Sequence, residues 1–408
     1  MNFSWFFANR IASGKNNKNN VSRLIILIGQ VAVFLGILVS IITISTGIGT
    51  RKAIKQKLSN FNGHIVVTDY LNGNSYATVP ISINQNFYPK FPSEEIEHIQ
   101  PFAALGGVIR TSENFEGIIL KGYNENYNKK YLTPFLTSGR LPNFYKDEYS
   151  NEVLISKKIA ASLNLSLNQS FIVYFIRENR KPIYRNLKIV GTFQTDIKDF
   201  DDSFVIGDIK HIQKINQWDR EKVGGFELFT TDIENIIPIK EKVNEKIDYS
   251  FAAETVIDKF SQITDWIKLF DTNVTIILTI MLIVVVINMV MVLLILIIDR
   301  THSIGLLKTL GANNFQIQEL FIYYGIRVVL PGLIFGNIIG LGFLLIQKYF
   351  HLIKLNPENY YVSEMPVYID WFYLLGLNLG SIVICSMVLI IPSFLVRKIM
   401  PIVALRYK

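Results

Sequence analysis

The residues that could carry out chemistry are few in this chain, and their spacing does not form an active site. The five histidines have neither an HExxH spacing nor a cysteine partner, so they give no metal-site pattern. No GxxxxGK[ST] sequence occurs, which excludes a P-loop for nucleotide phosphates. Ser156 lacks the glycine frame of a nucleophile elbow and is expected to cap a helix instead. We therefore expect no catalytic residue, no metal and no cofactor bound by this chain.

A polar interval at 299–321, DRTHSIGLLKTLGANNFQIQELF, lies between two long apolar runs. Ser303 can cap a short helix there, and Gly311 suits the left-handed position that would end it. Asn313 or Asn314 can then cap the next helix. The apolar face of the short helix would consist of Ile304, Leu307 and Leu310. A membrane protein without its own energy source could receive force from another protein at this interval.

Half of the 408 residues are hydrophobic, and four apolar runs are long enough to cross a membrane as helices. The runs are 24–46, 274–298, 328–347 and 372–396. The first exceeds the ~7 to 15 apolar residues of a signal peptide, which favours a retained span over a cleaved leader. None of the four contains Asp, Glu, Lys, Arg or His, so we do not expect coupling to an ion gradient.

The positive residues behind the net charge of +8 do not gather in one basic and aromatic patch, so we expect no nucleic-acid partner. Their positions relative to the apolar runs instead predict the membrane topology. Positive residues precede the first run and follow the last, which places both termini in the cytoplasm. They are Arg10, Lys15, Lys18, Arg23, Arg397, Lys398, Arg406 and Lys408. The basic residues of 51–57 oppose this orientation, but long domains cross membranes largely regardless of charge.

The region between the first two runs alternates short β-branched or aromatic segments with helical ones, which predicts an α+β domain. The expected strands are 64–68, 115–120, 152–155, 170–176, 187–190, 203–206 and 226–229. The expected helices are 93–99, 157–163 after Ser156, and 209–215 after Asp208. The single cysteine, Cys385, lies in the fourth run, so this domain has no disulfide and must rely on its core.

Three further features concern helices at the membrane. Segment 1–11 has apolar residues at helical spacing and predicts an interfacial helix, with a frayed aromatic tail as the alternative. Segment 260–270 indicates an amphipathic stalk, with a core helix of the external domain as the alternative. The small residues Gly332, Gly336 and Gly340, spaced by four, predict close packing of two helices. The mid-span amides Asn288, Asn337 and Asn378 predict hydrogen bonds to neighbouring helices.

The sequence DRTHSIGLLKTLGA at 299–312 resembles the signature of FtsX-like permeases, roughly ER-x-x-E-I-G-x-x-K-A-x-G-A. Asp299 and Ser303 stand where the signature has Glu, and the ending PIVALRYK resembles the family's closing motif. The matching residues are Arg300, Ile304, Gly305, Lys308, Gly311 and Ala312. The resemblance implies that these residues couple the chain to a cytoplasmic ABC ATPase, and that ATP and Mg are bound by this partner.

Further segments resemble the lipoprotein-releasing permeases of Gram-negative inner membranes. They are GRLPN at 139–143, NEVLISKKIAASLNL at 151–165, NLKIVGTFQTDIKDFD at 186–201, WIKLFDTNV at 266–274 and YYVSEMPV at 360–367. The resemblance implies four transmembrane helices with a large α+β, MacB-like periplasmic domain between the first two. It also implies a dimer with a second permease copy or a paralogue, which leaves homodimer and heterodimer open.

In that family an acylated lipoprotein leaves the membrane lipid through a cavity bordered by the first two spans and passes to a periplasmic carrier. Apolar residues that could line the cavity, or else pack helices or face lipid, are Phe34, Ile37, Ile41, Met281 and Met289. The carrier would contact the short loop at 178–185, where the candidates are Arg180, Pro182 and Arg185.

Two other functions stay open. A mechanotransmitting FtsX-like permease would regulate a periplasmic partner, such as a cell-wall hydrolase, without transport. A MacB-type exporter would usually carry its ATPase in the same chain, and this chain has no nucleotide motif. The resemblance throughout the external domain favours lipoprotein transport.

The sequence thus predicts alternating membrane and soluble segments. The cytoplasmic parts are the interfacial helix and hinge at 1–23, the coupling region at 299–320 and the tail at 397–408. The transmembrane helices are 24–46, 273–298, 321–347 and 372–396. The periplasmic parts are the domain with its stalk at 47–272 and the loop at 348–371.

Overall fold

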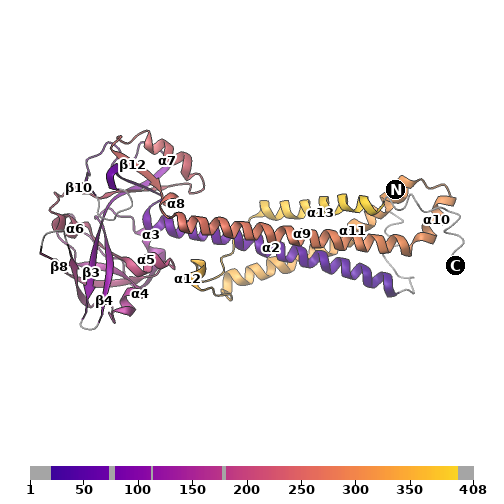
Figure 1. The fold of residues 1–408 in the computed structure, drawn as a ribbon, viewed down its shortest axis with the longest axis horizontal. Coiled ribbons are helices and arrows are strands. Elements are labelled where there is room, and N and C mark those ends of the chain that lie inside the picture. Colours follow the sequence, from indigo (N-terminus) through magenta and orange to yellow (C-terminus); the bar gives the residue numbers. More distant parts are fainter. Residues whose placement is uncertain (1–19, 73–78, 112–113, 177–180, 394–408) are drawn as a thin grey trace. The chain divides into compact units, whose positions relative to one another are not determined.

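The computed structural model describes residues 20–72, 79–111, 114–176 and 181–393, and it divides into two compact units. The helical unit contains Met1–Thr50, Ile267–Ile353 and Met365–Lys408. The sheet unit contains Arg51–Trp266 and Lys354–Glu364. Figure 1 shows the fold and labels the four long helices and many of the shorter elements. An α+β domain therefore lies between the first and second long helices, as predicted.

Four helices among the described residues are long and apolar enough to cross a membrane, which confirms the four predicted spans. They are α2 (Asn20–Asn62), α9 (Ser261–Asp299), α11 (Asn314–Phe350) and α13 (Trp371–Ser393). The first three extend beyond their apolar runs, and both α2 and α9 contribute residues to the sheet unit. The interfacial helix predicted at 1–11 and the tail at 397–408 lie outside the described residues.

The predicted stalk is the first part of α9. Phe260 and Ile263 belong to the sheet unit, whereas Ile267 and Phe270 belong to the helical unit. Phe260 packs edge-on against Phe200, with ring centroids 5.1 Å apart. The first part of the segment therefore belongs to the sheet unit, and its role as a stalk stays a prediction.

A short helix, α10 (Thr301–Thr309), follows α9 after one residue, so the prediction that Ser303 caps it is wrong. Arg300 takes the N-cap position without a side-chain hydrogen bond. The hydroxyl of Thr301 donates to the carbonyl oxygen of Ile298 at 2.8 Å, which satisfies one of the last carbonyls of α9. The new helix therefore starts directly at the end of α9.

Gly311 ends α10 as predicted. It adopts φ +95°, and its N–H donates to the carbonyl oxygen of Lys308 at 3.1 Å. The N–H of Ala312 donates to the carbonyl oxygen of Leu307 at 3.0 Å, which completes a Schellman motif. The end of α10 is thus hydrogen-bonded without help from another element.

Asn313, one of the two predicted caps, begins α11. Its side chain accepts a hydrogen bond from the N–H of Gln316 at 2.8 Å. The Gln316 side chain in turn accepts from the N–H of Asn313 at 3.0 Å. This reciprocal capping box satisfies two orphan donors and makes the joint between α10 and α11 a defined turn.

The sheet unit is built on a mixed ten-stranded sheet, in the order β12-β1-β11-β3-β4-β9-β6-β8-β5, with β7 paired to β3 and β8. Strands β4 and β9 are parallel, as are β6 and β8. The bounds are β1 (Ile65–Asp69), β3 (Ile96–Arg110), β4 (Phe115–Tyr123), β5 (Leu136–Gly139), β6 (Glu152–Ser156), β7 (Ser170–Phe175), β8 (Ile183–Phe193), β9 (Phe204–Asp208), β11 (Gly225–Thr230) and β12 (Phe251–Thr255). A separate pair consists of β2 (Ile81–Ser82) and β10 (Lys222–Val223). All seven predicted strands are present.

The helix predicted at 93–99 is wrong, because most of this segment belongs to β3. Ser93 bonds locally, accepting from the N–H of Glu95 at 3.3 Å, and starts no helix. Ile99 is 4% exposed and pairs with Leu228 of β11. The pairing of β3 with β11 therefore overrides the local helical pattern of this segment.

The remaining helices of the sheet unit are short, and the two predicted caps, Ser156 and Asp208, are confirmed. Ser156 accepts from the N–H of Ile159 at 3.0 Å, and Asp208 accepts from the N–H of Lys210 at 2.9 Å. The helices are α3 (Lys129–Leu132), α4 (Lys157–Ser162), α5 (Lys198–Ser203), α6 (Ile209–Asn216), α7 (Ile236–Asn244), α8 (Val256–Lys259) and α12 (Pro357–Tyr360). Single 3-10 turns occupy Tyr70–Asn72 and Thr133–Phe135.

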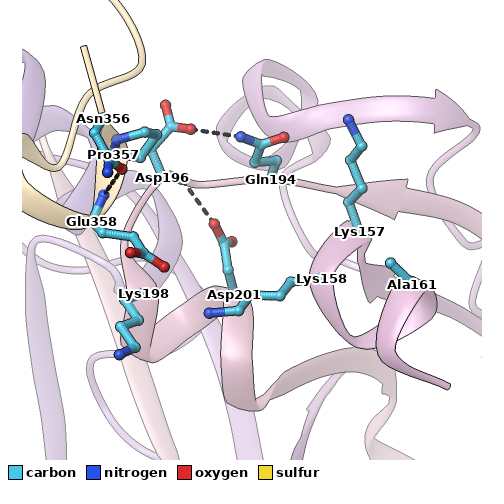
Figure 2. Close-up of a pocket in the computed structure, with 10 residues that line it drawn as sticks. All are labelled: Lys157, Lys158, Ala161, Gln194, Asp196, Lys198, Asp201, Asn356, Pro357 and Glu358. Carbon is cyan, nitrogen blue, oxygen red and sulfur yellow. Dashed lines mark hydrogen bonds between the residues drawn. The ribbon is translucent and has the colours of Figure 1, made fainter.

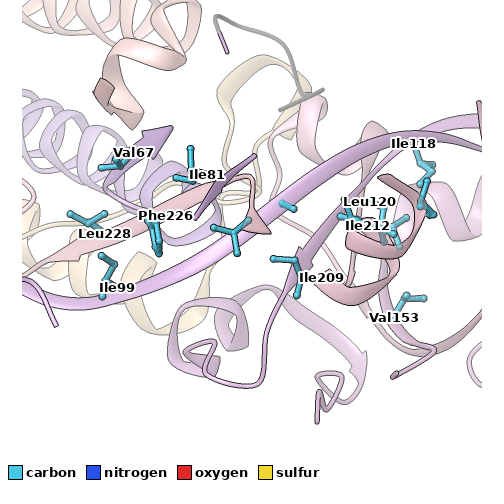
Figure 3. Packing of buried hydrophobic residues seen from close by; sticks show 14 of the residues in the cluster. Val67, Ile81, Ile99, Ile118, Leu120, Val153, Ile209, Ile212, Phe226 and Leu228 are labelled. Carbon is cyan, nitrogen blue, oxygen red and sulfur yellow. The ribbon is translucent and has the colours of Figure 1, made fainter. Parts of the chain in front are cut away.

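One face of the sheet packs the main apolar cluster of this unit (Figure 3). On β4 Leu120 belongs to this cluster, and on β11 Phe226 does. Successive side chains of a strand point to opposite faces, so the next residues, Lys121 and Glu227, lie on the other face. Both are nevertheless buried. The second face therefore also carries a covered layer.

The C-terminal end of α2 covers this second face. Phe61 is 1% exposed and stacks on Phe200 with ring centroids 4.8 Å apart, while Phe204 meets it edge-on at 5.4 Å. The chain then turns at Gly63, which adopts φ +77°. A Cβ on Gly63 would lie 2.8 Å from the Cβ of Glu227, so only glycine allows this approach.

A buried ion pair joins the end of α2 to the sheet. The Nζ of Lys121 lies 2.6 Å from Oε1 of Glu227 and donates to the carbonyl oxygen of Phe61 at 2.7 Å. Glu227 also accepts from Gln100 at 2.9 Å and from the Tyr123 hydroxyl at 3.1 Å. Burial lowers the pKa of the Lys121 ammonium, against the opposing effect of the Glu227 charge. Each charge is thus compensated by its partner and by hydrogen bonds.

Lys121→Met should lower the free energy of unfolding of the sheet unit by about 3 to 5 kcal/mol, because the Glu227 carboxylate stays buried without a counter-charge. Adding Glu227→Gln should recover most of this loss. Thermal unfolding of the full chain in detergent measures both effects. The control Lys130→Met breaks an exposed pair with Glu97 and should change stability by less than about 1 kcal/mol. Equal losses in the single and double variants would contradict the assignment.

Candidate functional site

Helix α2 packs against α11 at the three glycines predicted to allow close approach. The pairs are Gly332 with Val33, Gly336 with Ile37, and Gly340 with Ile41. A Cβ on Gly336 would lie 2.9 Å from the Cβ of Ile37. Each step of four residues along α11 matches a step of four along α2, so the two helices run parallel in a fixed register.

The same helix uses its own glycines against α9. The pairs are Gly29 with Val292, Gly36 with Val285, and Gly47 with Val274. A Cβ on Gly36 would lie 2.4 Å from a methyl carbon of Val285. Steps of seven and eleven residues forward on α2 match equal steps backward on α9, so these helices run antiparallel. Helix α2 is therefore the shared neighbour of α9 and α11.

These contacts place the predicted cavity residues in two groups. Ile37 and Ile41 are buried against the α11 glycines, and Met289 is 1% exposed within the helical core. Phe34 and Met281 are half-buried. The first group packs helices in this conformation, and a substrate role for any of the five stays a prediction.

Two of the predicted mid-span amides bond to each other. Nδ2 of Asn337 donates to Oδ1 of Asn378 at 2.7 Å, and the reverse bond measures 3.0 Å, which links α11 to α13. Asn288 instead donates to the carbonyl oxygen of Val284 in its own helix at 2.8 Å. Cys385, 3% exposed, belongs to the apolar cluster of the helical unit, as expected of a packing residue.

The residues predicted to couple to an ATPase divide between two faces of α10. Ile304 is 2% exposed and Gly305 is buried, so both face the rest of the helical unit. Ile304 shares a small apolar pocket with Arg300 and with Tyr324 of α11. Lys308 and Ala312 are half-buried, and Gly311 is exposed.

The sequence reasoning missed the apolar residues on the outer side of this region. Leu306 is 46% exposed, Leu310 76% and Phe315 72%. Leu310 is expected on the same face as Ile304, but six residues along a helix of ~3.6 residues per turn place the two side chains about 120° apart, so Leu310 lies on the exposed side with Leu306. The signal that could have found this surface is the four-residue spacing of Leu306 and Leu310. The exposed apolar surface of 306–315 is what a partner could contact.

The sheet unit holds an open cleft of about 510 Å³ between α4, the segment that follows β8, and α12 (Figure 2). Its charged side chains are Lys157, Lys158, Lys198, Asp196, Asp201 and Glu358. Positive and negative groups are equal in number, so the cleft favours neither an anionic nor a cationic ligand. No group of three or more His, Cys, Asp or Glu side chains able to hold a metal occurs in the described part of the chain.

Asp196 is a largely buried acid at this cleft with partners from two other segments. Its carboxylate is 9% exposed, lies 2.5 Å from the Nζ of Lys57 and accepts from Gln194 at 2.8 Å. Its backbone has φ +65°, held by the Asp201 carboxylate, which accepts from the N–H groups of Thr195 and Asp196 at 2.8 and 3.0 Å. Burial alone would raise the pKa of Asp196, but the hydrogen bond and charge of Lys57, together with hydrogen bonds from Gln194 and Ser363, outweigh it and lower the pKa.

The hairpin of β7 and β8 exposes an apolar face. Ile172, Tyr174 and Ile176 alternate with buried residues along β7 and its end, and they are 38%, 36% and 68% exposed. Tyr184 of β8 is 64% exposed and pairs with Tyr174, with ring centroids 6.5 Å apart. These four side chains form the hairpin face.

The predicted carrier contacts lie at the end of this hairpin. Pro182 is exposed, and Arg185 is half-buried with its guanidinium donating to the carbonyl oxygen of Tyr184 at 3.1 Å. Arg180 lies outside the described residues. The aromatic residues of the hairpin were missed, although their alternation with apolar neighbours in 170–176 is visible in the sequence.

Two family models match the chain. The MacB-like periplasmic core domain matches residues 31–244, more than half of the 408 residues, and the FtsX-like permease C-terminal model matches residues 275–401. Together they cover both units and the polar interval between α9 and α11.

Curated relatives align along nearly the whole chain. An uncharacterized membrane protein of Buchnera aphidicola subsp. Schizaphis graminum is 25% identical over 94% of this chain and 92% of its own. The lipoprotein-releasing system transmembrane protein LolE of Haemophilus influenzae is 21% identical over 98% of each chain. The protein of the same system named LolC, from the same Buchnera, is 23% identical over 94% of this chain and 93% of its own.

Gly336→Leu should destabilise the helical unit by about 1 to 3 kcal/mol, because the new side chain would overlap Ile37 and force α2 and α11 apart. The matched control is Gly342→Leu in the same helix, where a Cβ meets nothing within 4 Å. Thermal unfolding in detergent should show a lower midpoint for the first variant only. Equal midpoints for the two variants would exclude close packing at the glycine row.

Proposed function

Because the chain belongs to the FtsX-like ABC transporter permeases with a MacB-like periplasmic core domain, we propose that it is the permease of a lipoprotein-releasing system. It would take acylated lipoproteins from the outer leaflet of the inner membrane and deliver them to a periplasmic carrier. The observation that carries the proposal is the alignment with the LolE protein of Haemophilus influenzae over 98% of both chains. The similarity therefore includes the parts that would handle substrate as well as those that would receive energy.

In this proposal both termini and α10 lie in the cytoplasm and the sheet unit lies in the periplasm. The positive residues before the first span and after the last support that orientation. The functional unit would be a dimer with a second copy or a paralogue, together with ABC ATPase subunits that bind ATP and Mg.

Energy would enter through the outer surface of α10 and the start of α11. Leu306, Leu310 and Phe315 offer exposed apolar side chains that a partner could bury. The Schellman turn at Gly311 and the capping box at Asn313 make the joint between the two helices a defined one. A displacement of α10 by the ATPase would therefore be passed to α11, and from α11 to α2 through the glycine row. Arg300 and Lys308 would flank this contact.

The acyl chains of the substrate need an apolar wall that is not already packed. Helix α9 offers one, because its most exposed apolar residues between positions 276 and 291 recur every three or four positions along one face. They are Ile276, Ile280, Ile283, Ile287 and Met291. Half-buried Phe34 and Met281 remain candidates beside this row, whereas Ile37, Ile41 and Met289 would reach substrate only after the helices separate.

The carrier would dock on the hairpin face of β7 and β8. Tyr174 and Tyr184 supply aromatic surface with little rotamer entropy to lose, and Pro182 makes the approach to β8 rigid. Arg185 would add a charged contact at the rim.

Leu310→Asp should weaken copurification of the ATPase by about tenfold or more, because a charge would replace an apolar contact on the docking surface. Phe115→Asp is the matched control, since Phe115 is 76% exposed in the sheet unit and has no part in this contact. Size-exclusion profiles check that both variants stay folded. Unchanged ATPase association in the Leu310 variant would remove this surface from the coupling site.

The proposed function is tested by reconstitution in proteoliposomes with the partner ATPase. We expect ATP to drive release of a triacylated lipoprotein into a soluble carrier. Tyr184→Asp should lower transfer to the carrier several-fold with ATP hydrolysis unchanged. Tyr249→Asp, at another exposed tyrosine of the sheet unit, should transfer normally.

ATP-dependent activation of a cell-wall hydrolase without lipoprotein release would instead support mechanotransmission. ATP-driven export of a small molecule or peptide would support an exporter. Either result, obtained with an active ATPase in the same vesicles, would overturn the proposal.

A further inference from the structure

The connection between α11 and α13 is not a free loop. Its central part, Lys354–Glu364, belongs to the compact sheet unit rather than to the helical unit. Its two ends pair as an antiparallel bridge between Lys354 and Glu364, and the N–H of Leu355 donates to the carbonyl oxygen of Ser363 at 2.9 Å. This segment is called the strap below.

The strap is held to the sheet unit at the buried carboxylate of Asp196. The Nζ of Lys57 lies 2.5 Å from this carboxylate and donates to the carbonyl oxygen of Tyr361 in the strap at 3.5 Å, and hydrogen bonding from Ser363 contributes to the lowered pKa of Asp196. One acid thus joins three segments: the last turns of α2, the turn after β8, and the strap. A carboxylate has enough lone pairs to accept from all of these donors at once.

An apolar contact lies beside this polar one. Val362 is 3% exposed, although the residues around it in the strap are largely solvent-accessible. The ring of Tyr361 meets Trp266 of α9 edge-on, with centroids 5.4 Å apart. The ring of Tyr360 also lies edge-on to Trp266, with centroids 6.5 Å apart, so the strap contacts the first turns of α9 through two neighbouring tyrosines.

The open cleft beside the strap makes Asp196 important to this attachment. The cleft separates Asn356, Pro357 and Glu358 of the strap from α4, so this half of the strap is not packed against the helix (Figure 2). The strap is consequently fastened by its second half, around Tyr361 to Ser363. Loss of the carboxylate would leave the two ring contacts with Trp266 to hold it.

We infer that Asp196 latches the strap to the sheet unit, so that the sheet unit is tied to α11 and α13 as well as to α2 and α9. All four long helices then connect to the sheet unit, two directly and two through the strap. Asp196 is a positioning residue in this inference, and it touches no substrate. The latch itself does not depend on the proposed function, but its use in transport does.

Hydrogen exchange of the full chain in nanodiscs tests the latch without any assay of transport. Asp196→Asn removes the charge that holds Lys57 and should speed exchange in 354–365 by about tenfold, the equivalent of one charged hydrogen bond. Ser363→Ala removes the contact from the strap side and should act in the same segment. The strands of the sheet should keep their protection in both variants.

The matched control is Glu234→Gln, which breaks the exposed pair with Lys55 on the same part of α2. It should leave exchange in the strap unchanged. Unchanged exchange in both the Asp196 and Ser363 variants would overturn the latch. Faster exchange throughout the sheet unit in both variants would also overturn it, because the residues would then act on the whole fold.

Transport gives a second measurement. If the wild-type chain releases lipoprotein, Asp196→Asn should reduce release about fivefold or more while ATPase association stays normal. Normal release with a loosened strap would show that the latch exists but carries no coupling. If the wild-type chain releases nothing, the proposed function fails while the exchange result still decides the latch.

Discussion

The buried ammonium of Lys121 is the interaction on which the sheet unit depends most. It satisfies a carbonyl at the end of α2, neutralises Glu227 in the middle of the sheet and lies over the Phe61 ring, with Nζ 5.2 Å from the centroid. A hydrophobic pair of the same size could be equally stable, but it would not specify where the helix ends. The charge therefore fixes the register of α2 against β4 and β11. The turn at Gly63 follows from it, since this residue must pass close to Glu227.

A second constraint acts in the helical unit, where attraction cannot come from burial alone because lipid is as apolar as the side chains. Helix α2 meets this constraint by presenting glycines to α9 and β-branched residues to α11. Gly36 receives Val285 on one side, and Ile37 enters the space at Gly336 on the other. Adjacent positions of one helix thus serve two partners. A change of side-chain volume at Gly36 or Ile37 would therefore disturb the packing of α2 against both α9 and α11.

Features with a local pattern could be predicted from the sequence, and features that depend on distant partners could not. The spans, the caps at Ser156, Asp208 and Asn313 and the turn at Gly311 each follow from a few neighbouring residues. The helix at 93–99 was wrong because its strand partners are more than a hundred residues away. The interactions of Lys121 and Asp196 join residues 60 and 139 positions apart, so no local signal could reveal them. The polar interval could be located by its motif, but the assignment of Leu310 to the buried face was wrong, because Leu310 lies about 120° around the helix from Ile304.

The reciprocal amide pair between Asn337 and Asn378 has a consequence for how the chain enters the lipid bilayer. An asparagine side chain without a partner is costly in hydrocarbon, and each of these two has its partner on the other helix. Each Nδ2 also donates to the carbonyl oxygen four residues earlier in its own helix at 2.8 Å, so α11 inserted alone would keep that bond but leave Oδ1 of Asn337 without a donor until α13 arrives. Insertion of the two as a helical hairpin avoids this penalty at both sites. The pair therefore favours biogenesis in which the last two spans leave the translocon together.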